Sequence, residues 1–130
     1  VAVSTDGVNW TKSLQNPILE LGAPGAFDEN GLGEPAVWPQ FGRWWMLYTG
    51  RDKKEWRRIG LAVSTDGVKW KRVEETAKIE GREAWNEKVV CDPEIELLND
   101  GSVRVWFGGG DRPEPAENLH GQIGLGVLRP

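Results

Sequence analysis

The sequence predicts an all-β fold made of β-propeller blades, each a four-stranded antiparallel sheet, with about two blades in the chain. Three observations support this prediction. A unit of about 60 residues occurs twice, which is the signature of a repeat architecture. The 130 residues include 17 glycines and eight tryptophans, a composition typical of short strands joined by tight turns. No stretch shows the periodicity of an amphipathic helix.

The repeated unit emerges when four segments are matched to four later ones. The offsets of these matches lie between 58 and 64 residues, so insertions fall between the segments, where loops are expected. We therefore treat residues 1–130 as one partial β-propeller domain, with units at approximately 1–58 and 59–123 and a terminal strand at 123–128. The matched pairs are residues 1–10 with 61–70, 33–38 with 91–96, 43–52 with 102–111, and 59–63 with 123–127.

Each unit is expected to hold four strands, described here for the most complete copy. The first is Pro35–Trp38, a short run behind a proline. The second, Trp44–Thr49, alternates large side chains between two faces, as a strand does. The third is Ile59–Ser64, and the fourth lies near Trp70–Val73. Four antiparallel strands that return to the same pattern define a propeller blade.

Tight turns are predicted between these strands. Gln40–Gly42 and Asn99–Gly101 join the first strand to the second in the two units. Asp66–Gly67 joins the third strand to the fourth, because an Asp-Gly pair readily adopts the positive backbone angles of a two-residue hairpin turn. A propeller has a central funnel that opens on one face. The Ser-Thr-Asp-Gly segments at 4–7 and 64–67 are therefore interpreted as structural turns on the opposite face.

Composition and charge exclude several functions. The net charge is −4, with no basic block, which argues against nucleic acid as a partner. No apolar run approaches the roughly 20 residues of a membrane span. One cysteine, Cys91, excludes an internal disulfide, leaves the compartment open, and is expected to be a core residue because no histidine partners it. One histidine, His120, excludes a multi-histidine metal site, and neither a metal nor a cofactor is expected.

Four segments resemble the five-bladed propellers of glycoside hydrolase families 43, 32 and 130, the arabinanase, levansucrase and invertase type. They are Glu34–Val37, Trp44–Gly50, Ile59–Trp70 and Asp92–Ile95. The resemblance extends over nearly the whole chain and is more specific for the blade than for any one activity. It implies a propeller with a carbohydrate ligand in its central funnel. Members of these families are longer, because all five blades come from one chain.

The number of strands bears on how the propeller could close. The pattern gives nine strands, which is two blades and one extra strand. An open propeller exposes unpaired strand edges and half of an apolar blade interface. Two copies supply eighteen strands where five four-stranded blades need twenty, so closure requires overlap or a missing strand. We expect a homo-oligomer, with a dimer favoured; the alternative is that the chain is a piece of a longer gene.

The topology predicts which residues meet at the funnel. If the first strand of a unit begins at the mouth, the second ends there, and the loops after the second and fourth strands line it. Glu34 and Asp92 hold equivalent positions, each just before a proline at the expected start of the innermost strand. Both carboxylates are therefore expected to point into the funnel from neighbouring blades. The alternative is that they cap strand ends or bind loop amides.

Glu34 and Asp92 are the candidate catalytic pair. Glycoside hydrolysis uses two carboxyl groups beside one bond, one as acid and the other as base or nucleophile, roughly 5–10 Å apart. Crowded, partly desolvated carboxyl groups also raise the pKa of one partner, as a general acid requires. By resemblance, Glu34 matches the acid glutamate of these families and Asp92 a funnel aspartate. In families 43 and 32 the aspartates come first, whereas here Glu34 precedes Asp92.

Seven further residues are candidates for binding the carbohydrate. Sugars present apolar faces rimmed by hydroxyl groups, so an aromatic ring beside hydrogen-bonding groups suits them. Trp85 is either such a platform or a plug in the core. Asp52 and Asp111 end the second strand in both units and could instead shape a loop by pairing with arginine, while His120 could simply be exposed. The seven are Asp28, Arg51, Asp52, Trp85, Asn86, Asp111 and His120, and further candidates at the funnel mouth are Trp56, Arg57 and Arg112.

Three functions remain open on this evidence. The first is a glycoside hydrolase or phosphorylase-like enzyme that acts on a plant or microbial glycan through Glu34 and Asp92. The second is a carbohydrate-binding propeller without catalysis, which would use the same acids and aromatic residues to hold a sugar. The third is a structural piece of a propeller whose activity is association.

Overall fold

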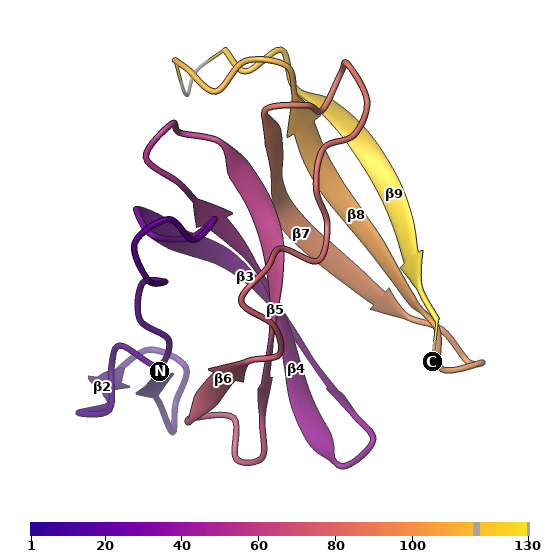
Figure 1. Ribbon diagram of the computed structural model, residues 1–130. Coiled ribbons are helices and arrows are strands. Elements are labelled where there is room, and N and C mark those ends of the chain that lie inside the picture. The colour runs from indigo at the N-terminus through magenta and orange to yellow at the C-terminus, as the bar shows by residue number, and fades with distance from the viewer. Residues whose placement is uncertain (116–117, 130) are drawn as a thin grey trace.

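The computed structural model describes residues 1–115 and 118–129, and over these residues the chain forms strands and no helix (Figure 1). Without a helix, no segment of the described residues meets the length and hydropathy of a membrane-crossing helix. The predicted all-β class is therefore confirmed. The strands are β1 (Ala2–Val3), β2 (Thr11–Lys12), β3 (Gly31–Gln40), β4 (Arg43–Arg51), β5 (Arg57–Ser64), β6 (Trp70–Arg72), β7 (Val89–Leu97), β8 (Val103–Gly110) and β9 (Gln122–Leu128).

The longer strands form two antiparallel blades. Blade 1 has the order β3-β4-β5-β6, and blade 2 has the order β7-β8-β9, with no fourth strand among the described residues. A single parallel pair, Arg57 with Val89, connects β5 to β7. Figure 1 shows the two blades fanning apart from the line where β3, β5 and β7 run close together. The prediction of propeller blades, about two per chain, is confirmed.

The predicted repeat is reproduced in the pairing of the strands. Leu47 lies opposite Leu61 in blade 1, and their counterparts Trp106 and Leu125 lie opposite each other in blade 2. The first strands carry an irregularity at the same place, between Gly33 and Ala36 in β3 and between Cys91 and Glu94 in β7. Equivalent positions in the two blades can therefore be compared directly, with offsets of 58 for β3, 59 for β4 and 64 for β5.

The innermost strands begin earlier than the sequence predicted. The proline was expected to mark the start of the strand, yet β3 begins at Gly31, before Glu34 and Pro35. In the same way, β7 begins at Val89 rather than at Asp92. A β-bulge accounts for the difference, because it leaves the proline, which has no N–H to donate, outside the regular ladder while pairing continues on both sides.

The main core lies between the blades. Blade 1 contributes Trp38, Leu47 and Ile59, and blade 2 contributes Val90 and Val105 and neighbouring residues of β8. Each of these side chains is less than a tenth exposed, so the blade-to-blade contact supplies most of the dry apolar interior. The face of blade 1 that points away from blade 2 carries a second, smaller cluster.

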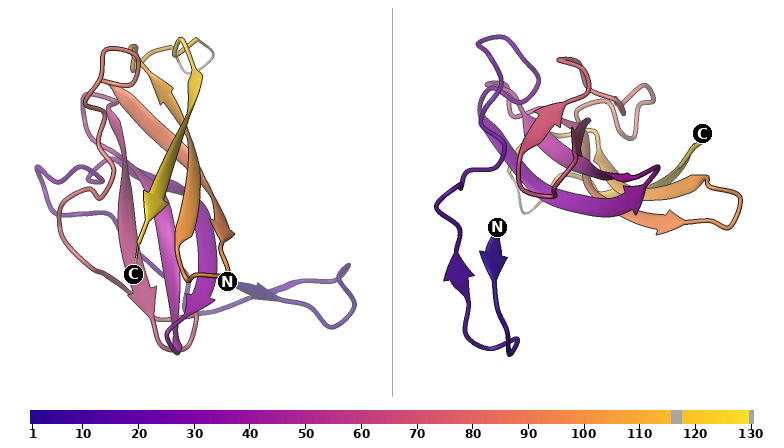
Figure 2. Two further views of the ribbon diagram at one scale, coloured as in Figure 1. Left: turned by 90° about the vertical axis from the view of Figure 1, so that its right-hand side faces the viewer. Right: turned by 90° about the horizontal axis from the view of Figure 1, so that it is seen from below.

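The N-terminal hairpin is the outer half of a blade standing alone. Strands β1 and β2 pair Ala2 with Lys12, in the register in which β5 and β6 pair Ala62 with Arg72. Every residue of 1–12 except Ser4 is exposed, and Figure 2 shows the hairpin projecting away from both blades. Blade 1 thus spans residues 31–72 and the three strands of blade 2 span residues 89–128, so the blades begin and end at other positions than the units predicted at 1–58 and 59–123.

Candidate active site

The two predicted catalytic acids lie side by side at the bulges of the innermost strands. Glu34 in β3 and Asp92 in β7 are both exposed and both have a φ of 52°. The nearest ligand atoms of Glu34, Asp92 and Cys91 lie within 4.8 Å of one another. The Asp92 backbone N–H donates to the Glu34 carboxylate at 3.4 Å and to the Thr49 hydroxyl at 3.1 Å. The structure therefore brings the acid pair together.

The bulge explains how each acid leaves the plane of its sheet. A positive φ is uncommon for a residue with a side chain and persists only where surrounding structure holds it. In both blades the following residue is Pro35 or Pro93, which cannot donate to the ladder and so leaves the bulge free to form. Bulges are common beside active sites because they redirect a side chain. Two identical bulges thus aim two carboxylates at one place.

A polar cavity of about 230 Å³ opens beside Glu34. Two arginines line it, Arg51 from the end of β4 and Arg57 from the start of β5, and Thr49 adds a hydroxyl. The Nη1 atom of Arg57 is buried and has no hydrogen-bond partner among the described residues. A buried donor without a partner costs free energy, which makes Arg57 a ready donor for an oxygen atom in the cavity. The remaining lining residues are Gly31, Leu32 and Gly33.

Cys91 supports Asp92 and has little nucleophilic character. Its thiol is buried and donates to the Asp92 Oδ2 atom at 2.8 Å. Burial, followed by the hydrogen bond and charge of Asp92, raises the pKa of this thiol well above its usual range. The thiol therefore stays protonated at neutral pH, whereas nucleophilic attack requires a thiolate. The sequence-based interpretation of Cys91 as a core residue is in agreement, but its contact with Asp92 was not foreseen.

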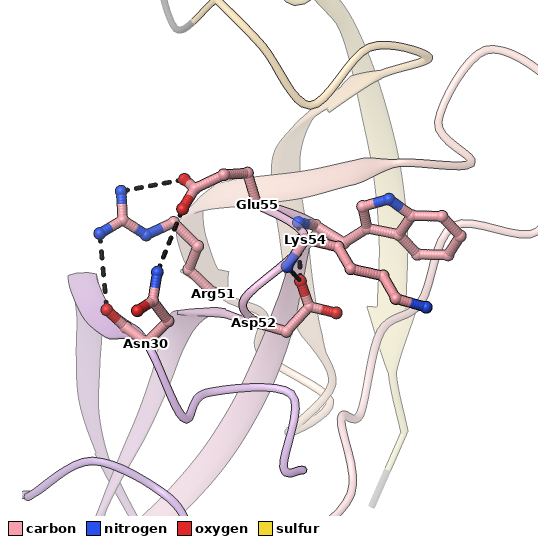
Figure 3. Close-up of polar contacts among 6 residues, drawn as sticks. Asn30, Arg51, Asp52, Lys54 and Glu55 are labelled. Atoms are coloured by element: carbon pink, nitrogen blue, oxygen red, sulfur yellow. Dashed lines mark hydrogen bonds and ion pairs between the residues drawn. The ribbon is translucent and has the colours of Figure 1, made fainter. Parts of the chain in front are cut away.

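Arg51 and Asp52 shape the loop between β4 and β5 (Figure 3). Arg51 forms an ion pair with Glu55 at 3.2 Å, and Glu55 also accepts from the Asn30 side chain at 3.1 Å. Asp52 accepts from the backbone N–H of Lys54 at 2.8 Å and of Trp56 at 3.0 Å. Asp52 thus holds its loop through backbone N–H groups, where the sequence suggested a salt bridge to arginine. Of the two residues, only Arg51 lines the cavity beside Glu34.

Asp28 is buried in blade 1 and does not reach the cavity. Its side chain is completely inaccessible and bonds the Tyr48 hydroxyl at 3.0 Å and the Arg72 guanidinium at 2.7 Å. Burial, with the nearby Asp28 charge, raises the pKa of Tyr48 above its ordinary value. Asp28 therefore ties the outer strand β6 to β4, and the expectation that it touches substrate does not fit its position.

Trp85 and Asn86 hold the positions in blade 2 that Phe27 and Asp28 hold in blade 1. The Trp85 ring stacks on Phe107 with ring centroids 6.2 Å apart, as Phe27 lies beside Tyr48 at 6.0 Å in blade 1. Asn86 is buried and accepts the Glu83 backbone N–H at 3.0 Å. The sequence left Trp85 as either a sugar platform or a plug in the core. In the structure it packs against the core beside β8 and does not line the cavity beside Glu34.

Asp111 and His120 close the loop between β8 and β9. The His120 Nδ1 atom lies 3.1 Å from Asp111 Oδ1, and both side chains are more than two fifths exposed. Neither residue lines the cavity beside Glu34. They belong to the loop of blade 2 that corresponds to the loop between β4 and β5 in blade 1.

Thr49 is the site residue that sequence analysis missed. Strand alternation placed it on a face with apolar side chains, and nothing in the pattern marked its hydroxyl as useful. Its place opposite Gly33, directly at the bulge, is what brings the hydroxyl to the Asp92 N–H. The one available signal was position: Thr49 ends the alternating run just before the Gly-Arg-Asp segment of the loop.

Comparison with known proteins places the fold. No protein family profile and no curated protein sequence matches this chain. Among solved structures, the chain is similar to one described as a glycoside hydrolase, with a TM-score of 0.76, 17% identity, and coverage of 99% of this chain and 35% of the other. Another similar structure comes from a study of family 130 enzymes that target β-1,2-mannosidic linkages in Candida mannan. Its TM-score is 0.75 at 18% identity, and the match covers 91% of this chain and 37% of the other.

A third similar structure is a family 32 β-fructofuranosidase from Bombyx mori, with a TM-score of 0.68 and 22% identity. It is covered over 26% of its length by 97% of this chain. At these identities the likeness establishes the fold, and the chain spans about a third of the structures it matches. The chain therefore has the fold of part of a glycoside hydrolase β-propeller, as the sequence resemblance implied.

Proposed function

We propose that this chain forms part of a glycan-processing funnel in which Glu34 and Asp92 cleave a glycosidic bond. The observation that supports this is the pair of matched bulges that hold two exposed carboxylates within 4.8 Å over a polar cavity. Retaining glycosidases set their carboxyl groups about 5 Å apart, whereas inverting enzymes leave a wider gap for water. The short spacing favours the retaining arrangement.

In this mechanism protonated Glu34 donates its proton to the glycosidic oxygen as the bond to the leaving group breaks. The Asp92 carboxylate attacks the anomeric carbon and forms a glycosyl ester. Water then attacks the anomeric carbon, its proton passes to the Glu34 carboxylate, and Asp92 is released. The Cys91 thiol donates a hydrogen bond to Asp92 Oδ2, so Oδ1 is the oxygen that would attack. Arg57 and Arg51 would bind hydroxyl groups of the sugar in the cavity.

A carbohydrate-binding propeller without catalysis is the second candidate. Both carboxylates are exposed, whereas a general acid gains from partial desolvation. Binding alone would use the same arginines and acids as hydrogen-bonding groups around a sugar. This function requires no proton on Glu34.

The experiment compares turnover and binding across oligosaccharides that include β-1,2-mannosides and β-fructofuranosides, the linkages named for two of the similar structures. Glu34→Gln should lower turnover at least about 100-fold and leave sugar affinity within a few fold, because the amide keeps hydrogen bonds but carries no acidic proton. The matched control is Glu94→Gln, an exposed glutamate of β7 outside the cavity. Full turnover in Glu34→Gln contradicts the role of Glu34 as the general acid, and sugar binding without turnover in the wild type supports the second candidate. No binding of any sugar contradicts both.

We also propose that the chain self-associates, with a dimer favoured, as the sequence analysis expected. Blade 2 has no fourth strand among the described residues, and several of its large apolar side chains are exposed. Unpaired strand edges and exposed apolar patches favour association. Association would also add further walls to the funnel beside Glu34.

A further inference from the structure

The outer face of blade 2 carries a cluster of four exposed apolar side chains beside the charged residues Glu94, Glu96 and Arg104. Trp106 of β8 and Ile123, Leu125 and Val127 of β9 are exposed by 41%, 78%, 50% and 48%. They project from neighbouring strands, since Trp106 lies directly opposite Leu125. Clusters of exposed apolar side chains of this kind mark interaction surfaces in folded proteins.

Blade 1 shows how the equivalent face packs when a neighbouring blade covers it. The counterparts of these four residues in blade 1 are Leu47, Ile59, Leu61 and Val63, by the pairing of β4 with β5. Leu47 and Ile59 are fully buried and Leu61 is partly buried, all in the core between blades 1 and 2. The exposed face of blade 2 is therefore equivalent to the face by which blade 1 packs on its neighbour.

The other side of that internal contact has an exposed counterpart as well. Blade 2 meets blade 1 through residues of β7 and β8 whose counterparts in blade 1 include Leu32 and Met46. In blade 1 these two residues, with Ile18, Leu19 and Tyr48, line a hollow of about 280 Å³ that is mainly apolar. In the repeat, Leu19 corresponds to Ile79, and Ile79 packs against the core between the blades. Each side of the internal interface is thus present a second time without its partner.

We propose that the outer face of blade 2 in one copy docks on the apolar hollow of blade 1 in a second copy. The contact repeats the one that blades 1 and 2 make within a chain, so it continues an interface already formed in this fold. Such a contact is heterologous, because two different surfaces meet, and each copy keeps one surface open for another partner. This inference rests on the self-association proposed above and involves no step of glycan chemistry.

Complementation between two variants tests this arrangement. Leu125→Arg places a charge on the blade 2 face, and Leu19→Arg places one in the blade 1 hollow; Leu14→Arg is the control, because Leu14 is fully exposed and lines neither surface. Light scattering after size exclusion should give multiples of 14.5 kDa for the wild type and the control, and 14.5 kDa for each face variant alone. An equimolar mixture of the two face variants should give a complex of one copy of each, because one intact surface of each kind remains.

A wild type that stays at 14.5 kDa at every concentration overturns the proposal, as do two monomeric variants that fail to combine. Near-ultraviolet circular dichroism checks that both variants fold. If either does not, Ile123→Lys and Trp44→Lys, at more exposed positions near the same two faces, replace the pair. Glu34→Gln should associate as the wild type does, so loss of turnover and loss of association are read separately.

Discussion

Blades 1 and 2 have the same strand pairing and differ in what covers them. Ile59 in β5 and Ile123 in β9 hold equivalent positions opposite Thr49 and Gly108, yet Ile59 is 0% exposed and Ile123 is 78% exposed. Blade 1 has a fourth strand and a neighbouring blade on one face, whereas among the described residues blade 2 has no fourth strand and nothing packs on its outer face. At these two positions residue type and register therefore do not decide burial. The neighbouring blade does.

The isoleucine pair gives the largest expected effect. Ile59→Ala should lower the free energy of unfolding by about 3 kcal/mol, because it leaves a cavity in the core between the blades. Ile123→Ala should change it by less than about 0.5 kcal/mol in dilute protein, because the side chain is in contact with water. Urea unfolding followed by tryptophan fluorescence measures both. Equal effects would show that the outer face of blade 2 is covered in solution, and an Ile123→Ala effect that grows with protein concentration would indicate coverage by another copy.

Glycines of β9 sharpen the comparison within blade 2. A Cβ at Gly124 would meet the ring of Phe107 and lie 2.9 Å from Trp85, whereas a Cβ at Gly126 would meet nothing within 4 Å. Gly124→Ala should therefore destabilise the protein by about 1–3 kcal/mol through overpacking. Gly126→Ala should be neutral or stabilise it by about 0.5 kcal/mol, because alanine loses less backbone entropy in a strand. Thermal unfolding compares the two, and a tolerated Gly124→Ala would mean that the Phe107 and Trp85 rings can shift to admit a methyl group.

The contrast between the blades also shows what the sequence could predict. The repeat, the strands and the pairing of Glu34 with Asp92 were accessible because spacing and alternation can be read directly from the sequence. The Asp66–Gly67 turn was predicted at the right place but with the wrong length, because Ser64 pairs with Trp70 and only Gly67 of the Asp-Gly pair has a positive φ. The bulge was not accessible, because Pro35 and Pro93 were interpreted as the start of a strand instead of a break inside one. Likewise, the packing of Trp85 depends on glycines of β8 and β9 that lie far from it in sequence. Contacts between strands decide such roles, and a single sequence does not display them.

The smallest expected effect compares the two Ser-Thr-Asp-Gly turns, one in the free hairpin and one in blade 1. Backbone N–H groups lower the pKa of both carboxyls, mainly that of Asn9 for Asp6 and that of Lys69 for Asp66. The Asn9 side chain donates a further hydrogen bond to Asp6 at 2.8 Å, for which Lys69 has no counterpart. Because both pKa values are lowered, each turn is stabilised above the ordinary carboxyl pKa of 3.8 and loses this stabilisation as the pH falls through its own lowered pKa.

Carboxyl NMR titration should therefore give both aspartates midpoints below 3.8, with Asp6 the lower of the two. Asn9→Lys should raise the Asp6 midpoint towards that of Asp66, since it removes the side-chain donor and leaves the backbone N–H in place. Lys12→Ala, on the neighbouring strand β2, is the control for general charge and should leave the midpoint nearly unchanged. If Asp6 titrates at its ordinary value, the free hairpin does not hold its turn in solution. The turn would then need the rest of a blade to form, as Asp66 has in blade 1.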